Sequence, residues 1–398
     1  MTTPDPATTA VRTAIESDTQ HGAVVPPLYL STNFTFSAFG EPRRYDYTRS
    51  GNPTRDALGD ALARLEGGAG ATVTASGTAA VTLVCQLLKP GDLLLAPHDC
   101  YGGTYRLFES LASRGLFCVR FVDQTDTESL RAAFALRPRM VWVETPSNPL
   151  LRIVDLEAVA ALCRRHQTLL VADNTFLSPA LQQPLSLGAD LVVHSTTKYL
   201  NGHSDVVGGA VVAGTPELAQ EIDWWANCLG LTGAPFDSYL TLRGVRTLHA
   251  RLRIHEENAH AVADLLDGHP AVARVFYPGL AQHPGHTLAR RQQKGFGGMI
   301  SFELRGGASA AQAFVEGMTC FSLAESLGGV ESLVAHPATM THAAMDEDAR
   351  LRAGIGDGLI RLSIGIEAAQ DLVADVAAGL ERASSAATRP PLAVAAAC

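Results

Sequence analysis

Short apolar runs that alternate with helix-like segments fill residues 70–214, and this alternation constrains the fold more than any other feature of the chain. The runs are ATVTAS, DLLLAPHD, FCVRFVD, MVWVETP, TLLVADNTF, DLVVHST and GGAVVAG, and amphipathic stretches such as residues 156–165 separate them. Strands that are apolar along their whole length are buried on both faces, which is typical of a mostly parallel sheet covered by helices. The middle of the chain is therefore predicted to be a large α/β domain.

The pattern changes in the last third of the chain. A helix at 259–266, a strand-like GGMISFEL and a final helix near 371–383 follow one another there. This mixture predicts a smaller α+β domain over residues 254–398, joined to the large domain through residues 231–253.

The two ends of the chain differ from these domains. The first 60 residues carry turn signals, at Pro26-Pro27, Gly40 and Gly51-Asn52-Pro53, and little periodicity, which predicts an extended arm over residues 1–60 that contacts a neighbouring subunit. The large domain is then expected over residues 61–253. The Ala/Pro-rich end, ATRPPLAVAAAC, predicts a loose tail.

The overall composition excludes several classes of protein. Hydrophobic residues make up 46% of the chain and charged residues 18%, which is typical of a globular enzyme and too apolar for a disordered chain. A formal net charge of -9 without a Lys/Arg block argues against nucleic acid as a partner. No apolar stretch approaches the ~20 residues of a membrane span, and the start MTTPDPATTA does not resemble a signal peptide. We therefore expect a cytoplasmic protein that does not bind membranes.

The seven cysteines are scattered and never form a C-x-x-C pair. Such a distribution fits neither a disulfide framework nor a structural zinc site, so no metal is expected. Most of the cysteines are predicted to be small core residues in a reducing compartment.

One strand-like run ends in polar residues around Lys198, in the segment ADLVVHSTTKYLNGHSDVVGG. Ligands of open α/β sheets bind at the carboxyl ends of the strands, so Lys198 stands where a site is expected. The hydroxyls of Ser195 and Thr197 beside it can bind a phosphate. A lysine after a strand is also often a solvated surface residue, and the segment alone does not separate the two interpretations.

Three further segments carry candidate site residues. Asp173 is the single charge of LLVADNTF, and a buried carboxylate there needs a partner such as a pyridinium nitrogen. The alternative is that Asp173 caps a helix or pairs with an arginine. In ATVTASGTAAV a strand meets a helix start, where Gly77 permits the close approach of a phosphate, although many such turns bind nothing. In PHDCYGGTYRLF, Tyr101 is either a ring that stacks on a flat cofactor or a core tyrosine.

Taken together, ordered motifs along nearly the whole chain resemble the Cys/Met-metabolism family of fold type I enzymes that use pyridoxal 5'-phosphate (PLP). The motifs are VVPPLYLSTNF, YDYTRSGNPTRDAL, PHDCYGGTYRLF, ETPSNPLLRIVD, VADNTFLSPALQQPLSLGADLVVHSTTKYLNGHSD, FDSYLTLRG, LAESLGGVESLVAHPATMTHA and IRLSIGIE. The resemblance implies PLP as the cofactor and the fold type I architecture of a large mostly parallel-sheet domain, a smaller C-terminal α+β domain and an N-terminal arm. It also implies a homo-oligomer, expected to be a tetramer built from dimers that share active sites.

The resemblance implies a role for individual residues. Lys198 matches the lysine that binds PLP covalently, Asp173 the partner of the pyridinium nitrogen, and Tyr101 a catalytic tyrosine that stacks on the cofactor. The phosphate contacts match Gly77, Thr78, Ser195 and Thr197 of one subunit and Tyr47 and Arg49 of its neighbour. The substrate-binding positions match Asp46, Arg106, Asn148, Glu325, Ser326 and Arg361. Arg361 matches the arginine that binds the substrate α-carboxylate with its planar fork, and a surface salt bridge is the alternative.

Two positions indicate at which carbon of the substrate the reaction occurs. Glu325 matches an acidic residue of the members that act at the γ-carbon, where β-eliminating members carry an aromatic residue, and Gly103 stands where methionine-cleaving members carry a reactive cysteine. The resemblance therefore implies γ-replacement, in which cysteine replaces the acyl group of an O-acylhomoserine, expected to be the succinyl ester, to give cystathionine for methionine biosynthesis.

Three alternatives remain open. Nearly the same residues support γ-elimination from cystathionine. A nicotinamide-dependent oxidoreductase also suits an alternating α/β domain, but the chain lacks the G-x-G-x-x-G fingerprint. A non-catalytic binding protein is the third alternative.

Overall fold

A seven-stranded sheet forms the centre of the large domain in the computed structural model, which describes residues 4–343 and 347–387. Its strands lie in the order β1-β7-β6-β5-β4-β2-β3. They are β1 (Gly70–Thr74), β2 (Leu93–Pro97), β3 (Cys118–Val122), β4 (Met140–Glu144), β5 (Leu169–Asp173), β6 (Leu191–His194) and β7 (Gly209–Ala213). Strand β7 is antiparallel to both of its neighbours and the other pairs are parallel. The predicted mostly parallel sheet is therefore confirmed, and each of its strands overlaps one of the seven apolar runs.

Helices cover both faces of this sheet because successive strand residues point to opposite sides. Leu94 and Ala96 of β2 pack in a cluster with Phe108, whereas Leu95 between them packs in a different cluster with Phe134. The helices of the first face are α3 (Gly77–Cys85), α4 (Gly102–Ser113) and α8 (Pro216–Leu229), and α5 (Thr127–Phe134) and α6 (Leu156–His166) lie on the second. Two short helical turns, α7 (Ser178–Leu181) and η1 (Pro184–Leu187), follow β5.

A five-stranded sheet forms the second domain within the described part of the chain, in the order β10-β11-β12-β9-β8. Its strands are β8 (Val272–Phe276), β9 (Met299–Leu304), β10 (Phe321–Leu323), β11 (Ser332–Ala335) and β12 (Leu359–Ser363). The helices that follow residue 234 are α9 (Pro235–Val245), which packs against α2, and α10 (Leu248–Leu266), α11 (His286–Gln292), α12 (Gly307–Val315), α13 (Glu347–Arg352) and α14 (Ala369–Ala387). Strand β10 pairs in parallel with β11 and the remaining pairs are antiparallel, which confirms the α+β prediction.

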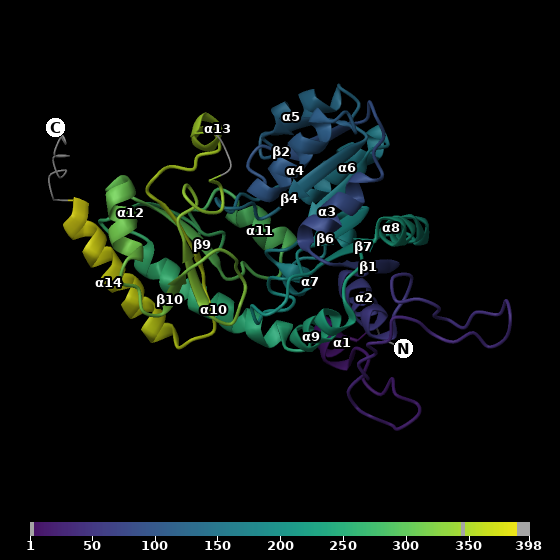
Figure 1. Cartoon of the computed structure of the whole chain (residues 1–398). Coiled ribbons are helices and arrows are strands. Elements are labelled where there is room, and N and C mark those ends of the chain that lie inside the picture. Colours follow the sequence, from purple (N-terminus) through teal and green to yellow (C-terminus); the bar gives the residue numbers. More distant parts are fainter. Residues whose placement is uncertain (1–3, 344–346, 388–398) are drawn as a thin grey trace, which may run out of the picture.

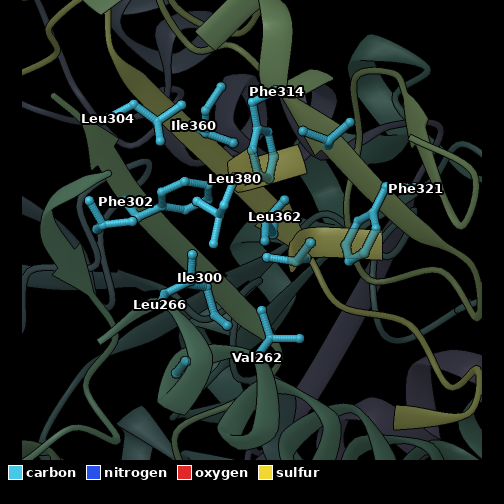
Figure 2. Close-up of a cluster of buried hydrophobic side chains, with 14 of the residues drawn as sticks. Val262, Leu266, Ile300, Phe302, Leu304, Phe314, Phe321, Ile360, Leu362 and Leu380 are labelled. Atoms are coloured by element: carbon cyan, nitrogen blue, oxygen red, sulfur yellow. The ribbon is translucent and has the colours of Figure 1, made fainter. Parts of the chain in front are cut away.

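The core of the second domain lies between this sheet and helices α10, α12 and α14 (Figure 1). Phe302 of β9 and Phe314 of α12 meet edge to face with their ring centroids 5.2 Å apart. Figure 2 shows these rings beside Leu380 of α14 and the side chains of the central strands. This separate core holds β12, and with it Arg361, beside the large domain.

The N-terminal segment is more helical than expected. Helix α1 (Pro6–Arg12) and helix α2 (Pro53–Glu66) flank residues 13–52. Isolated β-bridges, such as the one between Asn33 and Tyr47, pair residues within this segment. Figure 1 shows residues 13–52 as loops that project beside α1 and α2. Asn52 caps α2, because its side-chain oxygen accepts hydrogen bonds from the N–H groups of Thr54 and Arg55 at 2.9 Å and 3.3 Å. Asn52-Pro53, read as a turn, is therefore a helix start.

The predicted division of the chain at 60/61 and 253/254 stays a prediction, although both positions lie inside helices, α2 and α10. The contact of the arm with a neighbouring subunit also stays a prediction. The expected loose tail lies outside the described residues from position 388 onward.

The cysteines are less uniformly buried than expected. Cys85, Cys100 and Cys163 are buried, but Cys118 and Cys228 are exposed and Cys320 is intermediate. Among the residues that the structure describes, no helix combines the length and the apolar character that a membrane crossing requires.

Candidate active site

A cavity of about 200 Å³ lies where strands β1, β4, β5 and β6 end and the second domain meets the large one. It brings together most of the predicted site residues. Those that line it are Gly77, Thr78, Tyr101, Asn148, Asp173, Ser195, Thr197, Lys198, Glu325, Ser326 and Arg361. The site thus forms at the carboxyl ends of the strands, as in other open α/β sheets.

Four predicted residues do not line this cavity. Tyr47 and Arg49 line a second cavity of about 410 Å³, which shares Val207 with the first. Asp46 lies in the same N-terminal segment, where one of its carboxylate oxygens accepts the N–H of Tyr47. Arg106 lies on α4, with its side chain exposed. Within one chain, these four residues are therefore not brought to Lys198.

Lys198 lies in the turn after β6 with its amino group inside the cavity. Its Nζ lies 2.8 Å from the Oγ of Ser326, which comes from the second domain. Burial and the charge of Arg361 lower the pKa of Lys198 to about 8, against the opposing effect of the Glu325 charge. A lysine with this pKa carries a much larger share of free amine near pH 8 than a solvated lysine does, so it is a competent nucleophile and base.

Asp173 is the last residue of β5 and lines the same cavity. One of its carboxylate oxygens accepts the N–H of Thr175 at 2.9 Å. Burial nevertheless raises the pKa of Asp173, because the ionised form is poorly solvated. A cationic ring nitrogen beside this carboxylate would compensate that cost.

The turn between β1 and α3 forms a cradle for an anion. Helix α3 begins at Gly77, and Ser76 caps it by accepting the N–H of Ala79 at 3.0 Å. A Cβ atom added at Gly77 would lie 2.7 Å from the Cβ of Ser195, so this position has room for glycine alone. Thr197 is fixed by Gly208, whose N–H donates to its Oγ1 at 3.0 Å. Backbone N–H groups at a helix start beside two hydroxyls suit a phosphate.

Arg361 stands in the middle of β12 and is 3% exposed. Its Nη1 donates to the side-chain oxygen of Asn148 at 2.9 Å, and its Nη2 donates to the carbonyl oxygen of Ser326 at 2.8 Å. Its buried Nε has no partner among the described residues. Burial lowers the pKa of Arg361 to about 10. The alternative of a surface salt bridge is wrong, and a carboxylate ligand would supply the missing counter-charge.

Tyr101 is not a core residue, because it is 45% exposed and lines the cavity. It occupies the N-cap position of α4, and its N–H donates to the carboxylate of Glu144 at 2.9 Å. A ring at this place can stack on a flat ligand within the cavity.

Sequence reasoning missed Glu144, which also lines the cavity. It ends β4 just as Asp173 ends β5, and the two residues are register partners. The signal was present, because Glu144 is the single charge in MVWVETP. Thr104, Thr175, Phe176 and Thr341 also line the cavity without having been singled out.

These residues fit PLP. The amino group of Lys198 suits its aldehyde, the carboxylate of Asp173 suits its ring nitrogen, and the cradle at Gly77 suits its phosphate. The fit rests on two observations. Position 77 has room for glycine alone, and among the described residues the buried carboxylate of Asp173 lacks the cationic partner that the ring nitrogen would supply.

Comparisons with known proteins agree with this geometry. Cystathionine gamma-synthase of Escherichia coli (strain K12) is 56% identical over 379 residues, which cover 95% of this chain and 98% of the relative. The crystal structure of cystathionine gamma synthase from Xanthomonas oryzae pv. oryzae in complex with cystathionine has a TM-score of 0.96 and 63% identity, and the match covers 97% of this chain and 100% of that one. The structure of cystathionine gamma-lyase from Lactobacillus plantarum complexed with L-serine has a TM-score of 0.93 and 42% identity, with 96% and 100% covered.

The family model of the Cys/Met metabolism PLP-dependent enzymes matches residues 7–381. The nicotinamide-dependent and non-catalytic alternatives are therefore wrong. With a lysine, a carboxylate and an anion cradle placed around one cavity, and with this match over nearly its whole length, the chain belongs to the Cys/Met metabolism family of PLP-dependent enzymes.

Proposed function

We propose that this chain is a cystathionine γ-synthase, which replaces the acyl group of an O-acylhomoserine by L-cysteine to give cystathionine. The observation that carries the proposal is the double contact of Ser326, whose hydroxyl meets the amino group of Lys198 and whose carbonyl oxygen accepts from Arg361. An amino acid held by its α-carboxylate at Arg361 therefore presents its α-carbon to Lys198.

The chain's own residues then account for the proton transfers. PLP, when bound, supplies an electron sink for the electrons of the broken Cα–H bond. The amine of Lys198 removes the Cα proton, which its lowered pKa permits near neutral pH. A further proton then leaves Cβ. The Cγ–O bond breaks as a result, and the acyl group is released as a carboxylate. The sulfur of cysteine then bonds to Cγ as its S–H proton is lost, and protons return to Cβ and Cα.

Two residues favour chemistry at the γ-carbon. Glu325 lies next to Ser326 and keeps an acidic side chain at the cavity, in the position where β-eliminating members carry an aromatic residue. At Gly103 an added Cβ would lie 2.5 Å from the ring of Tyr101, so a cysteine there would displace that ring. The turn is therefore built around glycine, unlike the turn of the methionine-cleaving members.

The relatives also support synthesis over cleavage, since those named γ-synthase reach 56% and 63% identity and the γ-lyase structure reaches 42%. Cleavage of cystathionine to 2-oxobutyrate, ammonia and cysteine is the second candidate because that γ-lyase shares the fold over 96% of this chain. We expect the succinyl ester to be the preferred acyl donor.

The experiment compares initial rates on O-succinylhomoserine plus cysteine with rates on cystathionine alone. Cystathionine formation should be the faster reaction, and the Lys198→Ala variant should show neither. Faster release of 2-oxobutyrate from cystathionine would replace the synthase proposal by the lyase.

We propose in addition that the enzyme is a cytoplasmic homo-oligomer, a tetramer built from dimers that share their active sites. Tyr47 and Arg49 support this, because within one chain they lie outside the cavity of Lys198 and are free to complete that of a neighbour. Free thiols on the six described cysteines fit a reducing compartment.

A further inference from the structure

Glu144 and Asp173 end neighbouring parallel strands as register partners, and both line the cavity. Glu144 is 5% exposed. The candidate site assigns Asp173 to the ring nitrogen of the cofactor and gives Glu144 no role. Two carboxyl groups buried side by side are costly unless each is needed.

Both carboxylate oxygens of Glu144 accept hydrogen bonds from N–H groups. Oε2 accepts the backbone N–H of Tyr101 at 2.9 Å, and Oε1 accepts the indole N–H of Trp142 at 3.3 Å. Neither donor can accept a hydrogen bond in return. The contacts therefore favour an ionised carboxylate at position 144. A glutamine there would point its NH2 group at the N–H of either Tyr101 or Trp142, and two donors cannot form a hydrogen bond with each other.

The contact with Tyr101 closes the start of α4. Tyr101 is the N-cap residue of this helix of 12 residues, and its side chain makes no capping hydrogen bond. Helix starts carry unsatisfied N–H groups and favour negative charge. Glu144 reaches from β4 to supply that charge, and so fixes the backbone from which the Tyr101 ring extends over the cavity.

The groups around Glu144 oppose its ionisation. Burial and the carboxylates of Asp173 and Asp99 raise the pKa of Glu144 to about 8, even though the hydrogen bonds from Tyr101 and Trp142 favour its ionised form. The thiol of Cys100 lies in the turn before α4, and its own pKa is raised by burial and by Glu144. A cation placed beside Asp173 would offset the nearest of these negative charges.

We propose that Glu144 is a positioning residue that holds the Tyr101 ring over the cofactor by capping α4, and that it remains an acceptor because a cation bound at Asp173 balances the paired carboxylates. This inference rests on PLP as the ligand of the cavity, and it adds a function for a residue that contacts the turn rather than the reacting atoms.

The test measures PLP binding to the cofactor-free protein for wild type, Glu144→Gln, Glu144→Asp and Trp142→Phe. The two readouts are the dissociation constant and the visible circular dichroism per bound cofactor, which reports how the ring is held. Glu144→Gln should weaken PLP binding about 10- to 100-fold, as loss of a charge-assisted hydrogen bond implies, and should reduce the dichroism band. Glu144→Asp, which keeps the charge but is shorter, should fall between Glu144→Gln and wild type.

Trp142→Phe is the matched control, since it removes the donor to Oε1 and leaves the contact with Tyr101. It should stay within about threefold of wild type in PLP affinity. Wild-type values for Glu144→Gln in both readouts, or weaker binding by Glu144→Asp than by Glu144→Gln, would overturn the proposal. If Glu144→Gln does not fold, a wild-type affinity and dichroism of Glu144→Asp would overturn it instead. Failure of the wild-type protein to bind PLP would refute the proposed function itself.

Discussion

The amino group of Lys198 lies 2.8 Å from the hydroxyl oxygen of Ser326, although 128 residues separate them in the chain. Ser326 holds this place with a backbone φ of 109°, a region that favours glycine. Its carbonyl oxygen accepts from Arg361 at 2.8 Å. A single strained residue thus links the group that would react with the cofactor to the group that would bind the substrate, as strained backbone at functional sites often does.

Replacement of Lys198 by alanine should abolish the covalent cofactor and lower turnover by at least about a thousandfold, because the nucleophile and base is lost. The loss of the borohydride-sensitive absorbance and a kinetic assay measure both effects. Lys89→Ala, an exposed lysine in a turn, is the control and should behave as wild type. Substantial γ-replacement by Lys198→Ala would contradict the assigned role.

The rate at which the cofactor-free protein binds PLP covalently should rise between pH 7 and pH 9 with a midpoint near the pKa of Lys198, about 8. Below this pH the lysine is an ammonium ion and cannot attack the aldehyde, whereas above it the free amine reacts. Stopped-flow absorbance follows the reaction. Glu325→Gln should move the midpoint to lower pH, because the charge of Glu325 raises the pKa of Lys198. A midpoint above pH 10 would show that burial does not act on this lysine.

Gly77→Ala should weaken PLP binding by about tenfold or more, because the added methyl group would lie 2.7 Å from Ser195 and close the anion cradle. Equilibrium titration with PLP measures the change. Gly356→Ala is the control, since its Cβ would meet the end of the Glu303 side chain at 3.3 Å in the second domain. Equal affinity of the two variants would argue that the phosphate lies elsewhere.

Arg361→Lys should lower kcat/KM for the acyl donor by about 100-fold, chiefly through KM, while PLP remains bound. Lysine is a point charge and cannot offer two parallel N–H donors to a carboxylate. Asn148→Ala should give a smaller loss, because it removes a partner of Nη1 at 2.9 Å and leaves the guanidinium in place. Unchanged KM in both variants would remove Arg361 from the substrate site.

Mixed oligomers of Arg49→Ala and Lys198→Ala chains should recover about a quarter of wild-type activity, although each variant alone is inactive. Half of randomly paired dimers are mixed, and each of these holds one complete site if Arg49 acts in the neighbouring subunit. Refolding the two chains together and assaying the mixture measures the recovery. A mixture as inactive as its parts would place Arg49 and Lys198 of one chain in the same site.

Local sequence patterns are sufficient to predict a residue's place when the residues that define the pattern lie on the same strand or helix. The apolar runs predicted the strands of the large sheet, because burial on both faces requires apolar residues throughout in its central strands. Lys198 and Asp173 stood out as isolated charges at strand ends, and the structure places both at one cavity. Glu144 carries the same signal, and Asn52 fits both a turn and the helix cap that its side chain forms.

The amino-acid order by itself determined the parallel sheet, the second domain and the family, because hydrophobic period and motif spacing are local properties of the chain. The fold alone decided which charges share the site and how they ionise. Ser326 and Arg361 reach Lys198 through contacts made in three dimensions between two separately built cores, and the pKa of Lys198 falls to about 8 because those contacts exclude water.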